Sequence, residues 1–254
     1  MSAGPLRRDL LVVVPTYNEN DNLVDLVERI RASVPEADIL VVDDASPDGT
    51  GKLADSLART DRHVHVLHRL GKQGLGVAYV AGYGWGMARE YRRFVQMDAD
   101  GSHRPEQIPA LLERLVDADL VIGSRWVPGG DIVNWPRHRE WLSRGGNAYT
   151  RWMLGIPIRD ATGGFRAFRR RTLDNLTLGS VASQGYCFQV DLARRAVAAG
   201  FRVVEVPITF VERRYGDSKM SGGIVMEALW RVTAWGVTHR LRQIRDVLWR
   251  KRRS

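Results

Sequence analysis

Short apolar runs and longer amphipathic segments alternate along the first half of the chain. The runs predict strands at residues 10–14, 39–42, 64–66, 94–97 and 120–122. Between them, apolar residues recur at helical spacing from Leu23 to Val34, across residues 75–90 and after Pro105, a residue that suits a first helical turn. Because strands that alternate with helices form a sheet covered on both faces, the pattern predicts a mainly parallel, Rossmann-like α/β fold.

The second half of the chain departs from this alternation. Its patterns predict a loop leading into a helix, a second helix, a strand and a polar loop, at residues 127–147, 188–199, 203–206 and 210–223. Neither a linker-like change in composition nor an internal repeat is found. We therefore expect one catalytic domain at residues 1–222 and a helical appendage at residues 223–254.

Polar segments follow four of the predicted strands. Their sequences are PTYNE, DDASPDG, DADGSH and GSRW, which begin at Pro15, Asp43, Asp98 and Gly123. Ligands of open α/β sheets bind at the carboxyl ends of the strands. The four segments are therefore expected to form one site.

Composition narrows the class of protein. The chain has 254 residues, 44% of them hydrophobic, and no run of about 18 apolar residues that would span a bilayer. The polar start of the chain is not expected to act as a secretory signal. Its single cysteine, Cys187, is expected to be a buried residue in a reducing compartment.

The net charge of +9 predicts an anionic partner, and the charge is concentrated at the C-terminus. Residues 240–253 hold seven basic residues and one acid, with Leu241, Ile244 and Leu248 at helical spacing and Trp249 beside them. Such a basic amphipathic helix is typical of segments that bind an anionic membrane surface. A solvated tail and a nucleic-acid-binding tail are the alternatives, although no nucleic-acid recognition motif is present.

The DAD segment is the main candidate for metal chemistry. The first strand is not followed by the glycine pattern that binds dinucleotides, so a nicotinamide cofactor is not expected. Asp98 and Asp100 are one residue apart after a strand, and a tight turn would let both reach one hard cation, Mg²⁺ or Mn²⁺. Ser102 offers a third oxygen. A plain turn is the simpler interpretation of this segment.

Seven segments occur in an order that resembles family 2 glycosyltransferases. They are VVVPTYNE, VVDDASPDGT, KQGLGVAY, MDADGSH, GSRW, DATGGFRAFRR and RRYGDSKM, spread over about residues 10–225. Within that family the chain most resembles the polyprenol-phosphate (dolichol-phosphate) mannose synthases. The resemblance implies the GT-A fold and an inverting, metal-dependent transfer of mannose from GDP-mannose to a polyprenyl phosphate.

The resemblance also implies roles for single residues. The donor-binding set is Pro15, Tyr17, Glu19, Val42, Asp44, Asp98, Ala99, Asp100, Arg213 and Lys219. The metal set is Asp98, Asp100 and Ser102, although Ser102 stands where some relatives have Gln. The acceptor phosphate is assigned to Arg125, Arg139 and Ser143, and the catalytic set is Asp100, Arg125 and Arg139. Asp100 is interpreted as a metal ligand, because an acceptor phosphate that is already anionic needs no strong base.

Some assignments stay open at this point. Gln189 and Asp191 are candidates either for the acceptor side or for bracing a loop. Trp135, Trp141 and Trp152 are expected to pack in the core, and lining a path for the lipid is the alternative. Transfer of glucose or another sugar from a different nucleotide is the main alternative activity. The expected location is peripheral, at the cytoplasmic face of a membrane. An integral membrane protein that anchors the chain is a further candidate partner.

Overall fold

The apolar runs form a seven-stranded central sheet in the computed structural model, which describes residues 9–180, 186–212, 226, 228–238 and 240. The strand order is β3-β2-β1-β4-β7-β5-β8, and β7 alone is antiparallel to its neighbours. The strands are β1 Leu10–Thr16, β2 Asp38–Asp43, β3 Val64–His68, β4 Arg93–Gln96, β5 Leu120–Ser124, β7 Arg166–Arg169 and β8 Val203–Pro207. The prediction of a mainly parallel sheet is confirmed.

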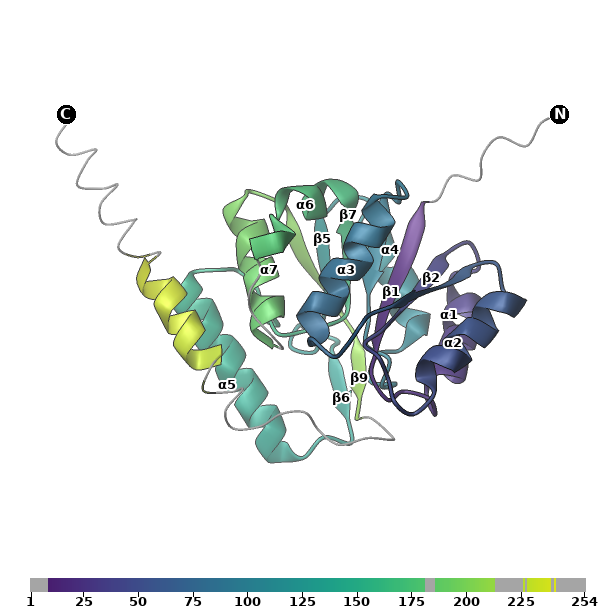
Figure 1. The fold of residues 1–254 in the computed structure, drawn as a ribbon. Coiled ribbons are helices and arrows are strands. Elements are labelled where there is room, and N and C mark those ends of the chain that lie inside the picture. The colour runs from purple at the N-terminus through teal and green to yellow at the C-terminus, as the bar shows by residue number, and fades with distance from the viewer. Residues whose placement is uncertain (1–8, 181–185, 213–225, 227, 239, 241–254) are drawn as a thin grey trace.

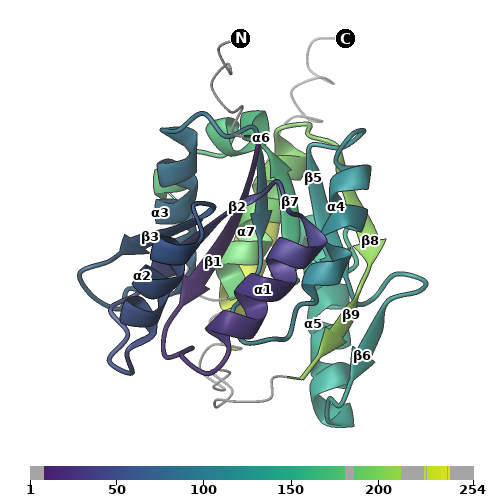
Figure 2. The same ribbon diagram turned by 90° about the vertical axis from the view of Figure 1, so that its right-hand side faces the viewer.

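Helices cover both faces of this sheet (Figures 1 and 2). They are α1 Leu23–Ser33, α2 Thr50–Thr60, α3 Leu75–Met87, α4 Ile108–Arg114, α5 Arg137–Leu154, α6 Arg170–Asn175 and α7 Tyr186–Ala198, with short 3-10 turns η1 Pro105–Gln107 and η2 Leu178–Ser180. Alternate residues of β1 face opposite ways. Val12 packs in a cluster with residues of α1, α2 and α4, whereas Leu11 and Val13 pack in a cluster with residues of α3 and α7.

The glycines of α3 allow this helix to lie directly on the sheet. A Cβ atom on Gly82 would lie 2.5 Å from Val13 Cγ1, and one on Gly86 would lie 2.5 Å from Phe94 Cε1. The Gly-interrupted helix predicted for residues 75–90 is therefore confirmed, and the glycines that weaken its propensity are needed for its packing.

Some boundaries predicted from the sequence were wrong, and one short strand was missed. β1 does not end before Pro15 but continues to Thr16. Its pairing with β4 ends at Val13, but its pairing with β2 continues, with Pro15 opposite Val42. β5 continues two residues beyond Ile122, to Ser124, in register with β8. The loop predicted before α5 contains a short strand, β6 Asp131–Val133, which pairs in parallel with β9 Thr209–Val211.

The C-terminal half places α5 against a second helix. Residues 226, 228–238 and 240 are helical and run beside α5 on the left of Figure 1. Tyr149 and Thr233 hydroxyls are 2.6 Å apart, and a Cβ on Gly236 would lie 2.8 Å from Met153 O. Trp141 and Trp152 of α5 are 76% and 63% exposed, so the prediction that they pack in the core was wrong. Most of the predicted appendage lies outside the described residues, and its division from the catalytic domain stays a prediction.

Candidate active site

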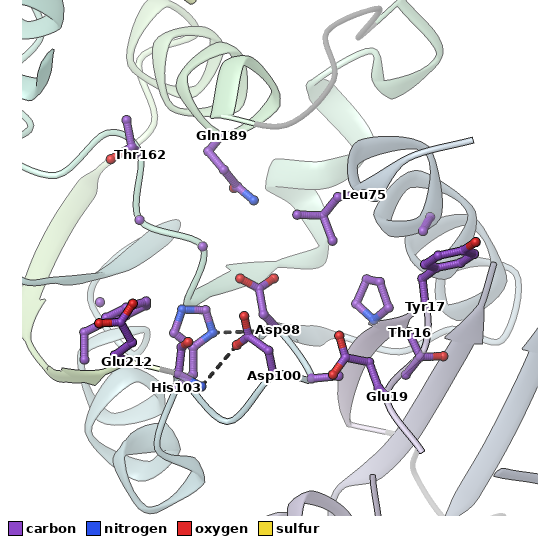
Figure 3. A pocket seen from close by; sticks show the side chains of 18 of the residues that line it. Thr16, Tyr17, Glu19, Leu75, Asp98, Asp100, His103, Thr162, Gln189 and Glu212 are labelled. Atoms are coloured by element: carbon purple, nitrogen blue, oxygen red, sulfur yellow. Dashed lines mark hydrogen bonds between the residues drawn. The ribbon is translucent and has the colours of Figure 1, made fainter. Parts of the chain in front are cut away.

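A cavity of about 360 Å³ lies at the carboxyl ends of β1, β2, β4 and β5, where the sequence predicted a site. Figure 3 shows the turn of Asp98 and Asp100 near its centre, with Glu19 to one side and Gln189 above. The predicted residues that line the cavity are Pro15, Tyr17, Glu19, Asp44, Asp98, Ala99, Asp100, Ser102, Arg125 and Arg139. Four strand ends therefore meet as the topology requires.

The turn after β4 is held by its own backbone and by His103. The Asp98 N–H donates to His103 Nδ1 at 3.0 Å, and the Ser102 N–H donates to Asp100 Oδ1 at 3.1 Å. Gly101 has φ +75°, a left-handed conformation that glycine adopts without strain. Burial lowers the pKa of His103, which keeps the ring neutral and leaves Nδ1 able to accept. Contacts within the chain therefore fix the conformation of this turn.

Two other segments, which contain Tyr79 and Gly164, lie close to the Asp98 carboxylate. Tyr79 of α3 donates its hydroxyl hydrogen to Asp98 Oδ1 at 2.8 Å. Burial, and next the charge of Asp98, raises the pKa of Tyr79 well above its usual value, so the phenol stays a neutral donor. On the other side, a Cβ on Gly164 would lie 3.2 Å from Asp98 Oδ2. A glycine there lets the loop before β7 approach the carboxylate closely.

The oxygen atoms at this turn fit a hard divalent cation. Asp98 and Asp100 offer carboxylates and Ser102 a hydroxyl, and all three line the cavity. Among the described residues, no three His, Cys, Asp or Glu side chains gather within reach of one metal ion. Two carboxylates leave positions for water and substrate phosphate, which is how Mg²⁺ is often bound at phosphate sites.

Asp44 lies at the end of β2 and holds the segment that precedes α3. It forms an ion pair with Arg69 and accepts hydrogen bonds from the backbone N–H groups of Gln73 and Gly74, at 3.1 and 3.2 Å. Beside it, the ammonium of Lys72 lies 3.9 Å from the centre of the Tyr17 ring. These contacts form the wall of the cavity at the ends of β1 and β2.

Val42 does not join the other predicted donor-binding residues. It is fully buried in the cluster that includes Leu40 and Tyr79, and it does not line the cavity. Adjacent residues of a strand point to opposite faces, so the alternation of β2 directs Val42 into the core.

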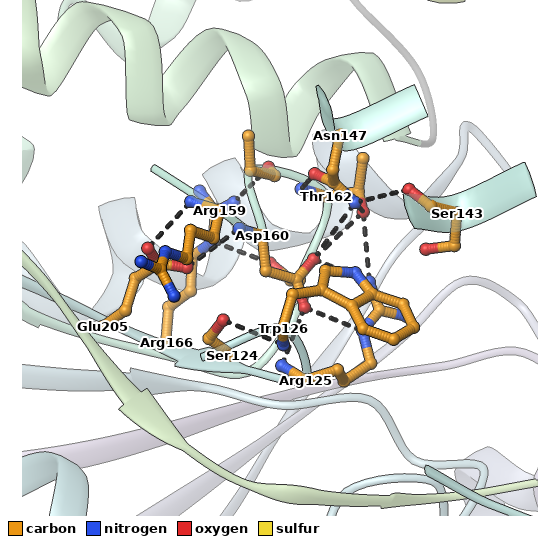
Figure 4. Close-up of polar contacts among 12 residues, drawn as sticks. Ser124, Arg125, Trp126, Ser143, Asn147, Arg159, Asp160, Thr162, Arg166 and Glu205 are labelled. Carbon is orange, nitrogen blue, oxygen red and sulfur yellow. Dashed lines mark hydrogen bonds and ion pairs between the residues drawn. The ribbon is translucent and has the colours of Figure 1, made fainter. Parts of the chain in front are cut away.

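Arg125 is bound to a buried carboxylate (Figure 4). Its Nε and Nη2 donate to the two oxygens of Asp160 at 2.8 and 2.7 Å, and its backbone N–H donates to Oδ2 at 3.0 Å. Burial alone would raise the pKa of Asp160, but the charge and hydrogen bonds of Arg125 outweigh it and hold that pKa below its usual value. Arg125 therefore lines the cavity as half of an ion pair with a fixed orientation.

Arg139 and Ser143 lie on α5 but reach different places. Arg139 lines the cavity, pairs with Glu212 and lies 4.9 Å from the Trp135 ring, which also lines the cavity. Ser143, one turn later, does not line it; its carbonyl accepts from Asn147 Nδ2 at 3.0 Å. The structure therefore brings Arg125 and Arg139 to one cavity and leaves Ser143 outside its wall. Arg213 and Lys219 lie outside the described residues.

Sequence reasoning missed several residues of the cavity. Leu75, Ala78 and the glycines of the TGG segment, residues 162–164, contribute a close-packed wall, and Thr162 and Phe210 add side chains from segments far apart in the sequence. Gln189, which the sequence offered as a candidate, also lines the cavity. The TGG segment carried a signal, because consecutive glycines before a strand indicate a close approach of the backbone. Asp191, paired with Gln189 as a candidate, instead binds Arg194 and Arg195 and does not line the cavity.

The chain is similar in sequence to several known proteins. The family model described as glycosyl transferase family 2 matches residues 11–177. An undecaprenyl-phosphate mannosyltransferase from Micrococcus luteus is 56% identical over 236 residues, which cover 93% of this chain and 97% of that protein. A polyprenol monophosphomannose synthase from Mycolicibacterium smegmatis is 54% identical over 240 residues, which cover 94% of this chain and 91% of that protein.

Solved structures share the fold. A glucosyl-3-phosphoglycerate synthase from Mycobacterium tuberculosis, in complex with Mn²⁺, UDP and phosphoglyceric acid, matches with TM-score 0.67 and 19% identity over 90% of this chain and 78% of that one. A mannosyltransferase from Pyrobaculum calidifontis, in complex with GDP-Man and Mn²⁺, matches with TM-score 0.55 and 19% identity over 92% and 74%. At such identity the likeness establishes the expected GT-A fold alone. With the family model matching most of its length, the chain belongs to glycosyl transferase family 2.

Proposed function

We propose that the chain transfers mannose from GDP-mannose to a polyprenyl phosphate, giving polyprenyl β-mannosyl phosphate and GDP. The observation that carries this proposal is the identity of 54–56% to the two bacterial relatives over more than nine-tenths of the chain. Their names specify both the sugar and the lipid phosphate. The carboxylates and arginines that line the cavity at the strand ends support the proposal.

The donor side of the reaction is assigned to the ends of β1, β2 and β4. Tyr17, Glu19, Asp44, Asp98 and Asp100 all line the cavity. We assign the first three to the nucleotide and the two aspartates to its diphosphate. Asp98, Asp100 and Ser102 would hold Mg²⁺ or Mn²⁺, which, when bound, offsets the negative charge that grows on the leaving diphosphate. Arg213 and Lys219 keep their assignment to the diphosphate from the family resemblance only.

The acceptor side is assigned to Arg125 and Arg139. An oxygen of the acceptor phosphate attacks C1 of mannose while the bond from C1 to the GDP oxygen breaks, and the electron pair leaves with GDP. Direct displacement inverts the α linkage to β. The phosphate is anionic at neutral pH, so no protein base has to remove a proton. The two guanidinium groups would attract and orient the phosphate by their positive charge, while Asp160 accepts from Nε and Nη2 of Arg125 and Glu212 pairs with Arg139.

Contact with a membrane surface is assigned to α5 and the helix beside it. None of the helices among the described residues is long and apolar enough to cross a bilayer. Large apolar side chains are nevertheless exposed on these two helices, at Trp141, Leu142, Trp152, Met226, Leu229, Trp230 and Val237. Arginines on the same helices, among them Arg144 and Arg240, suit anionic lipid headgroups. These exposed side chains support a peripheral location. The cytoplasmic face is proposed from the family resemblance alone, and an integral anchor protein stays a candidate partner.

The donor distinguishes this function from its main alternative. The test incubates the protein, Mg²⁺ or Mn²⁺ and undecaprenyl phosphate with either GDP-mannose or UDP-glucose, each labelled in the sugar. We expect labelled lipid from GDP-mannose alone. Labelled lipid from UDP-glucose and none from GDP-mannose would support the glucosyltransferase alternative.

A further inference from the structure

Gln189 has a buried carboxamide with no hydrogen-bond partner among the residues that the structure describes. The residue is 3% exposed, and both Oε1 and Nε2 lie out of contact with solvent. It belongs to α7 and lines the cavity; in Figure 3 its side chain points from this helix toward the space between Leu75 and Asp98. Buried amide atoms are nearly always hydrogen-bonded, because a buried amide without a partner destabilises the fold.

The backbone of Gln189 is held by a buried arginine. Its backbone carbonyl accepts a hydrogen bond from Arg166 Nη1 at 2.8 Å, and Arg166 is itself fully buried. Nearby, the buried Gln96 shows how an amide is normally satisfied: Tyr83 donates to Gln96 Oε1 at 2.6 Å, and Gln96 Nε2 donates to Gly164 O at 2.7 Å. The fold therefore satisfies one buried amide and presents the other to the cavity.

The chemistry of the amide selects among possible ligands. A carboxamide has both donors and an acceptor, so a hydroxyl group, which also donates and accepts, can satisfy both of its ends. A phosphate offers only acceptors and would leave Gln189 Oε1 unmatched. A prenyl chain offers neither.

We propose that Gln189 binds hydroxyl groups of the hexose of the donor and thereby contributes to the choice of sugar. The inference rests on the proposed transfer of a sugar from a nucleotide donor. Within that reaction, Gln189 completes its own hydrogen bonds only when the hexose is bound. A hexose that lacks the matching hydroxyl would leave the amide unsatisfied, and such mismatches are strongly discriminating in buried sites.

The test compares wild type with Gln189→Leu and Gln189→Met in two assays. Equilibrium binding, measured with Mn²⁺ present, uses GDP and GDP-mannose as separate probes. Transfer kinetics use GDP-mannose and its singly deoxygenated analogues. Each variant should keep the wild-type affinity for GDP and lose roughly tenfold to 100-fold in kcat/KM with GDP-mannose. For the analogue that lacks the hydroxyl bound by Gln189, kcat/KM should be low with wild type. The two variants should show no further loss of kcat/KM with that analogue.

Gln96→Leu serves as the matched control for folding. It breaks two existing hydrogen bonds and should lower the midpoint of thermal unfolding by roughly 4–8 °C, whereas Gln189→Leu should not lower it. Wild-type values of kcat/KM in both Gln189 variants, or an equal loss of affinity for GDP and GDP-mannose, would overturn the inference. If wild type used UDP-glucose instead, the same comparison with UDP and UDP-glucose would test Gln189 although the proposed donor had failed.

Discussion

Tyr79 and Asp98 are joined by a hydrogen bond of 2.8 Å between α3 and the turn after β4. The bond orients one carboxylate of the candidate metal site from α3, a helix whose first residue, Leu75, also lines the cavity. Partners of metal-binding carboxylates hold those groups in the geometry that the ion requires. The position of α3 and the strength of metal binding are therefore expected to be linked.

Tyr79→Phe removes this bond and keeps the ring. We expect the concentration of Mn²⁺ needed for half-maximal GDP binding to rise about tenfold, as for other residues that orient metal ligands. Tyr83→Phe is the matched control, since Tyr83 is also buried in α3 but donates to Gln96. It should leave the Mn²⁺ requirement unchanged. An unchanged requirement in Tyr79→Phe would show that this bond does not support metal binding.

Asp160→Asn tests whether Arg125 faces an anion in the cavity. Loss of the carboxylate leaves a buried guanidinium without its counter-charge, so the free energy of unfolding should fall by about 3–5 kcal/mol. If Arg125 contacts the acceptor phosphate, added inorganic phosphate should raise the thermal midpoint of this variant more than that of wild type. Asp119→Asn breaks a different arginine pair, with Arg171, and should show no such gain. If inorganic phosphate raised the thermal midpoints of the two variants equally, the assignment of Arg125 to the acceptor phosphate would be contradicted.

Replacing Trp141 and Leu142 together with serine tests the membrane assignment of α5. These side chains are 76% and 47% exposed, and burying such groups in lipid is worth about 1.5–3 kcal/mol each. Sedimentation with phosphatidylglycerol vesicles should therefore show at least a roughly tenfold weaker association than wild type. Val116→Ser, which removes an exposed apolar residue beyond the end of α4, should sediment as wild type does. If Val116→Ser lost as much association with the vesicles as the double variant, the assignment of membrane contact to α5 would be contradicted.

Asp38 should make the stability of the fold depend on pH in the acid range. Burial alone would raise its pKa, but hydrogen bonds from His65, Tyr91 and His63 lower that pKa to about 2. Because the pKa is lower in the folded state, ionised Asp38 stabilises the fold above about pH 4, and this contribution is lost as the pH falls toward 2. The difference in free energy of unfolding between wild type and Asp38→Asn should shrink by about 1–2 kcal/mol from pH 5 to pH 2, after allowing for solvent screening. A constant difference, measured by urea unfolding, would contradict this.

The strands and the centre of the site were predictable because they depend on local patterns. Apolar runs buried on both faces give β1 and β2, and the topology of a parallel sheet then brings the segments at Asp44, Asp98 and Arg125 together without further information. The antiparallel strand β7 was not predicted. An arginine such as Arg166 is expected at the surface, but this one is fully buried. Three backbone carbonyls accept hydrogen bonds from its guanidinium and compensate for its burial.

The remaining details depend on contacts between distant segments. Nothing in the sequence around Gln189 distinguishes it from Asp191, but the structure turns the first toward the cavity and pairs the second with Arg194 and Arg195. The pairing of Arg125 with Asp160 likewise joins residues 35 apart in the chain. Aromatic residues at helical spacing predict packing, and Trp141 is exposed only because no described element covers that part of α5.

Transfer by wild type and by Asp100→Ala, from GDP-mannose to undecaprenyl phosphate, tests the central claim most directly. Mass spectrometry would identify the lipid product, NMR its anomeric configuration, and circular dichroism the fold of the variant. We predict polyprenyl β-mannosyl phosphate from wild type and no product from a correctly folded Asp100→Ala. The metal ion would lose one of its protein ligands, and the departure of the diphosphate depends on that ion. Equal turnover by the two proteins, or no product from wild type, would contradict the account.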